Sequence, residues 1–238
     1  MIKLFLYLFP IILIYLPDLY VKNIFKKNNK ILNDMPFSGK DLADKILKDF
    51  KLENIPINSI KKIPIGNCNY DPIKKEINIS ESIYNRKSIT SLAVIVHEIG
   101  HAIQHKEKSK LLDLRIKLIK KTKILQNVGS VLFIIGLPFI FTVTKSFLLT
   151  IITGLIIIGC LSTNVLVHLI TLPNETDASF NKALPILKKY VPRENLKQCR
   201  SVLIAAAFTY LAGSIRSILQ LRVILFSFFS IFKSMIRR

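Results

Sequence analysis

The chain has 238 residues, about half of them hydrophobic, and a formal net charge of +20. That length suits one domain, or one small domain combined with membrane segments. The charge alone would suit a nucleic-acid-binding protein, but the lysines accompany abundant Ile and Asn and crowd beside apolar runs, so no nucleic-acid partner is expected. The cysteines Cys68, Cys160 and Cys199 form no CxxC pair, which argues against both a disulfide framework and a cysteine-based zinc site.

The first apolar segment is "LFLYLFPIILIYLP", residues 4–17. A cleaved signal peptide would need a small-residue cleavage site after this segment. Asp18, Leu19 and Tyr20 follow instead. We therefore predict an uncleaved N-terminal membrane anchor over residues 1–21.

Residues 22–123 are predicted to form a cytoplasmic α+β segment. "SGKDLADKILKDF" is expected to be a helix, with Ser38 as N-cap and Asp41 at the capping-box position. "INSIKKIPI" and "EINIS" are expected to be strands of a short β-hairpin, joined by the turn-rich "GNCNYDP". The strand "EINIS" would be available to pair with an extended peptide.

The next predicted helix begins at Ser88, its expected N-cap, and runs through "ITSLAVIVHEIGHAIQHK". His97 and His101 are four residues apart and so share one helix face, while Glu98 is turned by about 100° from His97. This HExxH pattern is typical of zinc hydrolases, in which two histidines bind one Zn²⁺ and the glutamate is the general base. The pattern predicts one Zn²⁺ per chain, held in part by the two histidines, and a catalytic Glu98.

Residues 124–172 are predicted to form two transmembrane helices. Lys145 is the single charged residue between Ile124 and Asn174, and it separates uncharged runs of 21 and 29 residues. Each run is long enough to cross a hydrocarbon core of roughly 30 Å. A polar segment, 173–200, follows, and 201–238 is expected to be a membrane-associated helix or hairpin interrupted by Arg216 and Arg222. The fold class is thus a mainly α-helical integral membrane protein.

A catalytic zinc needs a third protein ligand from outside the HExxH helix. His105 lies roughly 12 Å along the helix axis from His97, too far to share the ion, so it is expected to be a structural partner of the site. The extended metzincin pattern is excluded, because Gln104 and Glu107 replace the Gly and His that it requires. The downstream candidates are Glu107, Asp113, His168, Glu175, Asp177 and Glu194. Asp177 has a structural role available, since it occupies the capping-box position if Asn174 is an N-cap after Pro173, whereas Glu175 has none.

The motifs "YDP", "HEIGHAIQH", "TLPNETDAS" and "VLIAAAFTYLA", in this order and spacing, resemble the YugP-type neutral zinc metallopeptidases, a family of bacterial membrane proteases with a gluzincin-like HExxH…E pattern. The resemblance runs from about residue 36 to 225. It implies His97 and His101 as metal ligands, Glu98 as catalytic base and Glu175 as third ligand. Ser179 stands where gluzincins have an Asp, so either Asp177 or Ser179 is expected to support the histidines.

The predicted function is that of a membrane-anchored zinc metallopeptidase that acts on peptide or membrane-protein substrates. Residues 22–123 contain 22 basic and 11 acidic residues, which places this segment, and with it the active site, on the cytoplasmic side of the inner membrane. Residues 173–200 are expected on the same side. The alternatives are a non-catalytic scaffold with a vestigial zinc site and a site-2-type intramembrane protease. The second requires HExxH within a span, but charged residues flank that helix closely.

Overall fold

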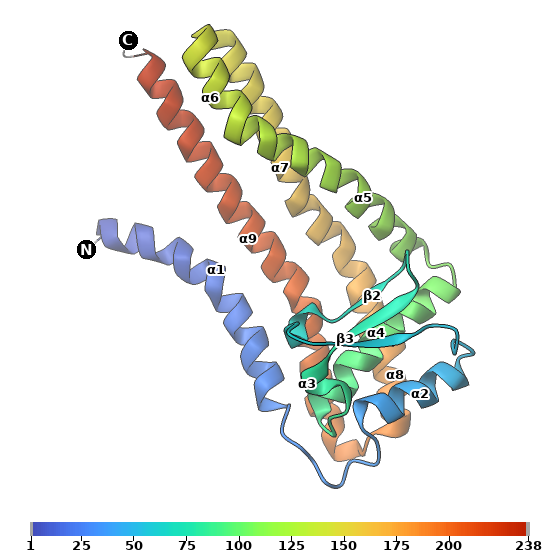
Figure 1. The fold of residues 1–238 in the computed structure, drawn as a ribbon. Helices are drawn as coiled ribbons and strands as arrows, with labels where there is room; N and C mark the ends of the chain where they lie inside the picture. The colour runs from blue at the N-terminus through green and yellow to red at the C-terminus, as the bar shows by residue number, and fades with distance from the viewer. Residues whose placement is uncertain (1, 237–238) are drawn as a thin grey trace. The chain divides into compact units, whose positions relative to one another are not determined.

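The structure, a computed structural model, describes residues 2–236 (Figure 1). It is mainly helical and contains one small three-stranded sheet, in agreement with the predicted class. The chain divides into two compact units. The first contains residues 2–14, 115–170 and 211–236, and the second contains residues 15–114 and 171–210.

Three helical stretches of the described chain are long and apolar enough to cross a membrane: Lys110–Thr144, Phe147–Tyr190 and Arg193–Leu219. The first combines α5 (Lys110–Val131) and α6 (Leu137–Phe139) with π-helical turns, and the second begins with α7 (Phe147–Thr176). The third lies in α9 (Leu196–Ile236), which is one continuous helix. Of the two forms considered for the C-terminal region, the structure therefore has the helix and not the hairpin.

Large apolar side chains are exposed on the helices of the first unit. Leu148 is 65% exposed and Ile134 is 70% exposed. In water this exposure would be costly, because burial of apolar surface is the main term that favours folding. Exposed apolar side chains on long uncharged helices are typical of surfaces that contact lipid.

Polar and small residues hold these helices together. Gln126 Nε2 on α5 donates to Asn164 Oδ1 on α7 (3.1 Å), and Asn164 Nδ2 donates to Ser217 Oγ on α9 (2.8 Å). A second contact packs Phe228 of α9 directly on Gly154 of α7, where any Cβ would lie 2.0 Å from the ring. Interhelical hydrogen bonds and small residues at contacts are the means by which membrane helices associate.

The helices of the second unit start where the sequence predicts. Ser38 caps α2 (Gly39–Asp49) in a complete capping box with Asp41, and Ser88 caps α4 (Ile89–Lys106) by accepting from the Ser91 N–H. Every residue of α4 from position 89 to 104 is buried, because the hydrophobic core of this unit surrounds the helix. The helix with the HExxH motif is thereby held on all sides.

The sheet differs from the prediction. β3 (Glu76–Ser80) lies between β1 (Ile57–Ile60), to which it is parallel, and β2 (Asn69–Asp71), to which it is antiparallel. The hairpin joins β2 to β3, and β2 lies within the segment predicted as a connection. Since β3 is paired on both sides, it cannot accept a peptide strand, so that expectation for "EINIS" is wrong.

The remaining elements of the second unit are short. They are α3 (Glu81–Tyr84), α8 (Leu184–Tyr190), a π-helical segment at Asp177–Ala183 that joins α7 to α8, and the 3-10 turns Ile65–Asn67 and Arg193–Asn195. The predicted anchor lies in α1 (Ile2–Lys27). The side chains of residues 1–14 lie outside the described part of the chain, so membrane insertion of this helix stays a prediction.

Candidate metal centre

The two histidines of the motif lie one turn apart on α4 and face the same side of the helix. Both are buried, and their ring centroids are 4.8 Å apart with the rings nearly perpendicular. Because α4 is capped at Ser88 and enclosed by the hydrophobic core, its backbone fixes the positions of both histidines. The two imidazoles therefore lie next to each other on one face of the helix.

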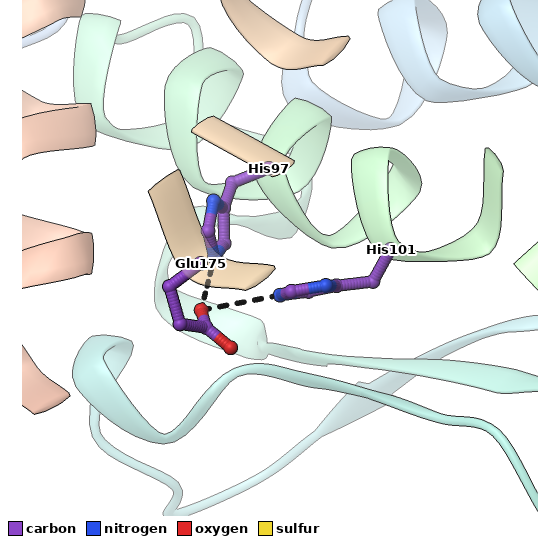
Figure 2. Close-up of side chains that lie close together, drawn as sticks. All are labelled: His97, His101 and Glu175. Carbon is purple, nitrogen blue, oxygen red and sulfur yellow. Dashed lines mark hydrogen bonds and ion pairs between the residues drawn. The ribbon is translucent and has the colours of Figure 1, made fainter. Parts of the chain in front are cut away.

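Glu175, near the end of α7, completes a three-residue cluster with the histidines (Figure 2). Its Oε2 lies 3.4 Å from His97 Nε2 and 3.3 Å from His101 Nε2. The carboxylate is fully buried. One ligand atom from each of the three residues lies within 4.8 Å of the others, which makes them the group of described residues that could hold a metal ion.

The helical path to Glu175 differs from the prediction at Pro173. The sequence indicated a new or kinked helix after Pro173, with Asn174 as a possible N-cap and Asp177 in its capping box. Instead α7 continues through Pro173, and the chain widens into the π-helical segment at Asp177 without an intervening cap. Asp177 consequently has a different role, since its carboxylate accepts from Gln104 Nε2 at 2.6 Å and from Asn181 Nδ2 at 2.7 Å.

Both histidines are fixed through their Nδ1 atoms. Ser179 Oγ lies 3.0 Å from His97 Nδ1, and Gln104 Oε1 lies 2.9 Å from His101 Nδ1. The orientation of the Gln104 amide is determined by its neighbours, because its Nε2 donates both to the Asn174 carbonyl (3.0 Å) and to Asp177. Its Oε1 therefore faces His101 as an acceptor, which places the proton of a neutral His101 on Nδ1.

This arrangement fits a zinc ion. The Nε2 atoms of His97 and His101 both face Oε2 of Glu175, so the three atoms that would bind a metal converge on one place. Ligands about 2.0–2.2 Å from a tetrahedral Zn²⁺ are about 3.3–3.6 Å from one another. The two measured distances to Glu175 Oε2 agree with that geometry, and two imidazoles with one carboxylate form a common catalytic zinc set.

Glu98 is held on another side of α4 by the edge of the sheet. Its Oε2 accepts a hydrogen bond from the backbone N–H of Tyr70 in β2, at 2.8 Å. The Tyr70 hydroxyl in turn lies 2.7 Å from His105 Nδ1. His105 is thus linked to Glu98 through Tyr70, whereas Ser179 and Gln104 contact the other two histidines directly. Burial raises the pKa of the Tyr70 phenol to about 12, so the hydroxyl keeps its proton at neutral pH.

The remaining sequence candidates have other environments. Glu107 pairs with Lys182, Asp113 and Glu194 are exposed, and His168 belongs to the first unit, where its ring packs on Gly213. The cysteines of the described chain form no disulfide. Burial raises the pKa of the Cys68 thiol to about 12, so it is not available as a thiolate ligand.

Gly100 allows α4, which carries the two histidines, to approach the π-helical segment at Asp177–Ala183 closely. A Cβ at this position would lie 2.8 Å from the carbonyl oxygen of Ala178 in the π-helical segment. In the structure the space is taken by the backbone next to Ser179, so the glycine sets the distance between the histidine helix and the segment opposite it.

The roles of Gln104 and Tyr70 were not predicted from the sequence. Gln104 was noted only as a departure from the metzincin pattern, although a glutamine inside an apolar helix, three residues after a ligand histidine, needs buried hydrogen-bond partners. Tyr70 was noted only as part of the "YDP" motif, because the pattern of a three-residue strand is too short to detect.

Comparison with known proteins agrees with this chemistry. A family described as "Putative neutral zinc metallopeptidase" matches residues 3–229. The chain is 30% identical over 202 residues to a protein of Bacillus subtilis (strain 168) named "Putative membrane protease YugP", covering 84% of this chain and 85% of that relative. No solved structure matches. The family resemblance drawn from the sequence motifs is confirmed.

Proposed function

Because the chain belongs to the family of neutral zinc metallopeptidases, we propose that it is a membrane-anchored peptidase that hydrolyses peptide bonds with Glu98 as general base. In this proposal His97, His101 and Glu175 hold one Zn²⁺ per chain. The observation that carries the proposal is the buried cluster of these three side chains, with both histidines oriented through Nδ1.

When bound, Zn²⁺ would polarise the scissile carbonyl and acidify the attacking water. Glu98 takes the proton of that water and later delivers it to the leaving amine, so the proton is carried between the two by a single carboxylate. The backbone N–H of Tyr70 donates to Glu98 Oε2 and so orients the carboxylate. The same bond keeps the carboxylate from rotating away.

The roles of the neighbouring side chains follow from their contacts. Ser179 orients His97, and Gln104 orients His101 while being held itself by Asp177. Partners of this kind fix the ring and tautomer of a metal-binding histidine, and their loss typically weakens metal affinity by about 10–100-fold.

The proposed location is the inner membrane, with the centre on the cytoplasmic side. Three helices of the described chain have the length and composition of membrane spans. The two segments predicted to face the cytoplasm, 22–123 and 173–200, supply most of the residues of the second unit, which also contains the centre. A cysteine introduced at Phe50 should be labelled from the cytoplasmic side, and labelling from the periplasmic side would contradict the assignment.

The activity is tested with the detergent-purified full chain, its Glu98→Gln variant and its Glu175→Ala variant. We expect Glu98→Gln to keep zinc, measured by elemental analysis, and to lose peptide hydrolysis, since an amide cannot accept the proton. We expect Glu175→Ala to lose most of the zinc as well as the activity, while Asp177→Ala and His168→Ala keep at least part of the metal.

Three results would contradict parts or all of the proposal. Hydrolysis by Glu98→Gln within tenfold of the unsubstituted chain would show that Glu98 is not the base. Full zinc occupancy in Glu175→Ala together with loss in His168→Ala would mean that three histidines hold the ion. A chain that binds no zinc and cleaves no peptide would be the non-catalytic scaffold.

A further inference from the structure

A cavity of about 480 Å³ lies in the second unit beside α4. Four parts of the chain form its walls: the loop after α2, the β2–β3 hairpin, the last turns of α4, and the start of α5. Its volume falls within the range of about 300–1,000 Å³ that is usual for ligand pockets. The lining residues used below are Lys51, Lys75, Lys106, Lys108, Tyr70 and His105.

The cavity is basic. Four lysines line it, and Asp113 is the one acidic residue that does so. The lysines come from three of the four walls, so their positive charges face a common space. A cleft lined by one sign of charge concentrates ligands of the opposite sign. Lys106 is held in place by its own hydrogen bond to the carbonyl oxygen of Phe50 across the cavity mouth.

The cavity is joined to the proposed catalytic centre through two residues of its wall. Tyr70 donates its backbone N–H to Glu98 and places its hydroxyl against His105. Ala102 follows His101 directly on α4 and also lines the cavity. The wall of the cavity therefore contacts Glu98 through Tyr70, which makes the cavity the pocket next to the proposed catalytic centre.

We infer that this cavity is a specificity pocket that binds a carboxylate of the peptide substrate, from an acidic side chain or from the C-terminus. The inference rests on the proposed peptidase function. The lysines supply positive charge, and the hydrogen-bonded pair of Tyr70 and His105 forms a polar part of the wall on the side of Glu98. A neutral side chain at the same position would lack the charge that the lysines attract, and a basic side chain would be repelled by them.

Three of the lysines can be replaced without disturbing the backbone. Lys51, Lys75 and Lys108 have φ values of 52°, 54° and 54°, in the left-handed region that glycine adopts more readily than any other residue. Glycine removes each side chain and relieves the steric cost of that conformation, which offsets the entropy that glycine loses on folding. Lys62 has a φ of 66° but does not line the cavity, so Lys62→Gly is a matched control.

The test compares the full zinc-loaded chain, the triple variant Lys51→Gly/Lys75→Gly/Lys108→Gly, and Lys62→Gly. The substrates are three peptides of one sequence that differ at a single position, with Glu, Gln or Lys, each made as C-terminal acid and as amide. Hydrolysis gives kcat/KM, and fluorescence anisotropy after removal of zinc by a chelator gives binding without cleavage.

We expect the unsubstituted chain and Lys62→Gly to prefer a carboxylate-bearing peptide. Because single exposed ion pairs contribute little, we expect the three substitutions together to lower kcat/KM for that peptide about tenfold, with little change for the Gln amide peptide. Preference for Glu over Gln would identify a side-chain carboxylate, and preference for acid over amide a C-terminal one. Either preference should shrink at high salt, since the lysines are exposed.

Equal kcat/KM values for all six peptides, or a preference that survives in the triple variant, would overturn the inference while leaving the peptidase function intact. Absence of hydrolysis of every peptide, with charge-dependent binding lost in the triple variant, would instead contradict the peptidase function and support the pocket. Absence of both hydrolysis and charge-dependent binding would contradict both.

Discussion

The close approach at Gly100 can be tested by adding one methyl group. In Gly100→Ala the new Cβ would lie 2.8 Å from the Ala178 carbonyl oxygen, whereas ordinary contact begins at 3.4 Å. The two backbones must then separate by about 0.6 Å, the difference between these distances. Overpacking of this kind costs about 1–3 kcal/mol, and the better helix propensity of alanine returns about 1 kcal/mol, so the free energy of unfolding should fall by about 0–2 kcal/mol.

The effect on the metal should be larger than the effect on stability. Metal–ligand distances in a functional site are held to about ±0.2 Å, and the separation moves the segment of Ser179 away from the helix of the histidines. We expect zinc affinity to fall about tenfold or more in a competition titration with a fluorescent chelator. Thermal unfolding with excess chelator gives the change in stability separately.

Gly159→Ala is the matched control, because nothing lies within 4 Å of a Cβ at that position of α7. It should leave zinc affinity unchanged and the chain at least as stable. If Gly100→Ala bound zinc within twofold of the unsubstituted chain, the contact with Ala178 would not set the geometry of the centre, and the reasoning would be refuted.

Three further predictions concern single side chains. Gln104→Ala should lower zinc affinity by about 10–100-fold in the same titration, because the ring of His101 loses the partner that orients it; an unchanged affinity would contradict that role. Ser38→Ala should lower the free energy of unfolding by about 1 kcal/mol. The side-chain hydrogen bond from Ser38 also lowers the pKa of Asp41, so the stability from this pair is present above the unfolded pKa of an aspartate, about 3.9, and is lost as the pH falls through the folded value. Chemical unfolding curves across that range should show a smaller loss in Ser38→Ala, which keeps the backbone N–H of residue 38 as a donor to Asp41. Asn164→Leu should weaken association of the three membrane helices by about 1 kcal/mol, measured by unfolding in detergent, and no change would show that the polar chain does not stabilise them.

Two helix starts and two long apolar helices could be predicted from local signals in the sequence. The caps at Ser38 and Ser88 were predicted because a capping side chain lies within three residues of the N–H that it binds, so a short stretch of sequence is enough to recognise it. The two central spans were predicted because an uncharged run of that length has few alternatives. These features depend little on the rest of the fold.

The sheet was predicted less well because its pairing is non-local. Parallel pairing of β1 with β3 depends on which strands meet in space, and β2 is too short for its alternation to be recognised. The N-cap considered at Asn174 does not form, because α7 continues through Pro173 although a proline disfavours helix interiors.

The residues of the candidate centre also divide into those that the sequence predicted and those that only the structure identified. His97, His101 and Glu175 were identified because a motif and a family resemblance pointed to them, and the structure brings them together. The partners of the two histidines were reached only in part. Ser179 was named as a partner, but Gln104 was not, since its role depends on acceptors 70 and 73 residues away along the chain.

The π-helical segment at Asp177–Ala183 has a consequence for insertions and deletions in this chain. A π-helical turn is an α-helical turn that contains one additional residue. Removing one residue from the segment would restore ordinary α-helical hydrogen bonding, which is locally favourable. Because the wide turn already contains the additional residue, the helices before and after it would keep nearly the same orientation. The side chains within the segment would instead shift by one position, Ser179 among them. A one-residue deletion before Ser179 should therefore yield a folded chain in which His97 loses its Ser179 partner, whereas the same deletion in an exposed loop would change little.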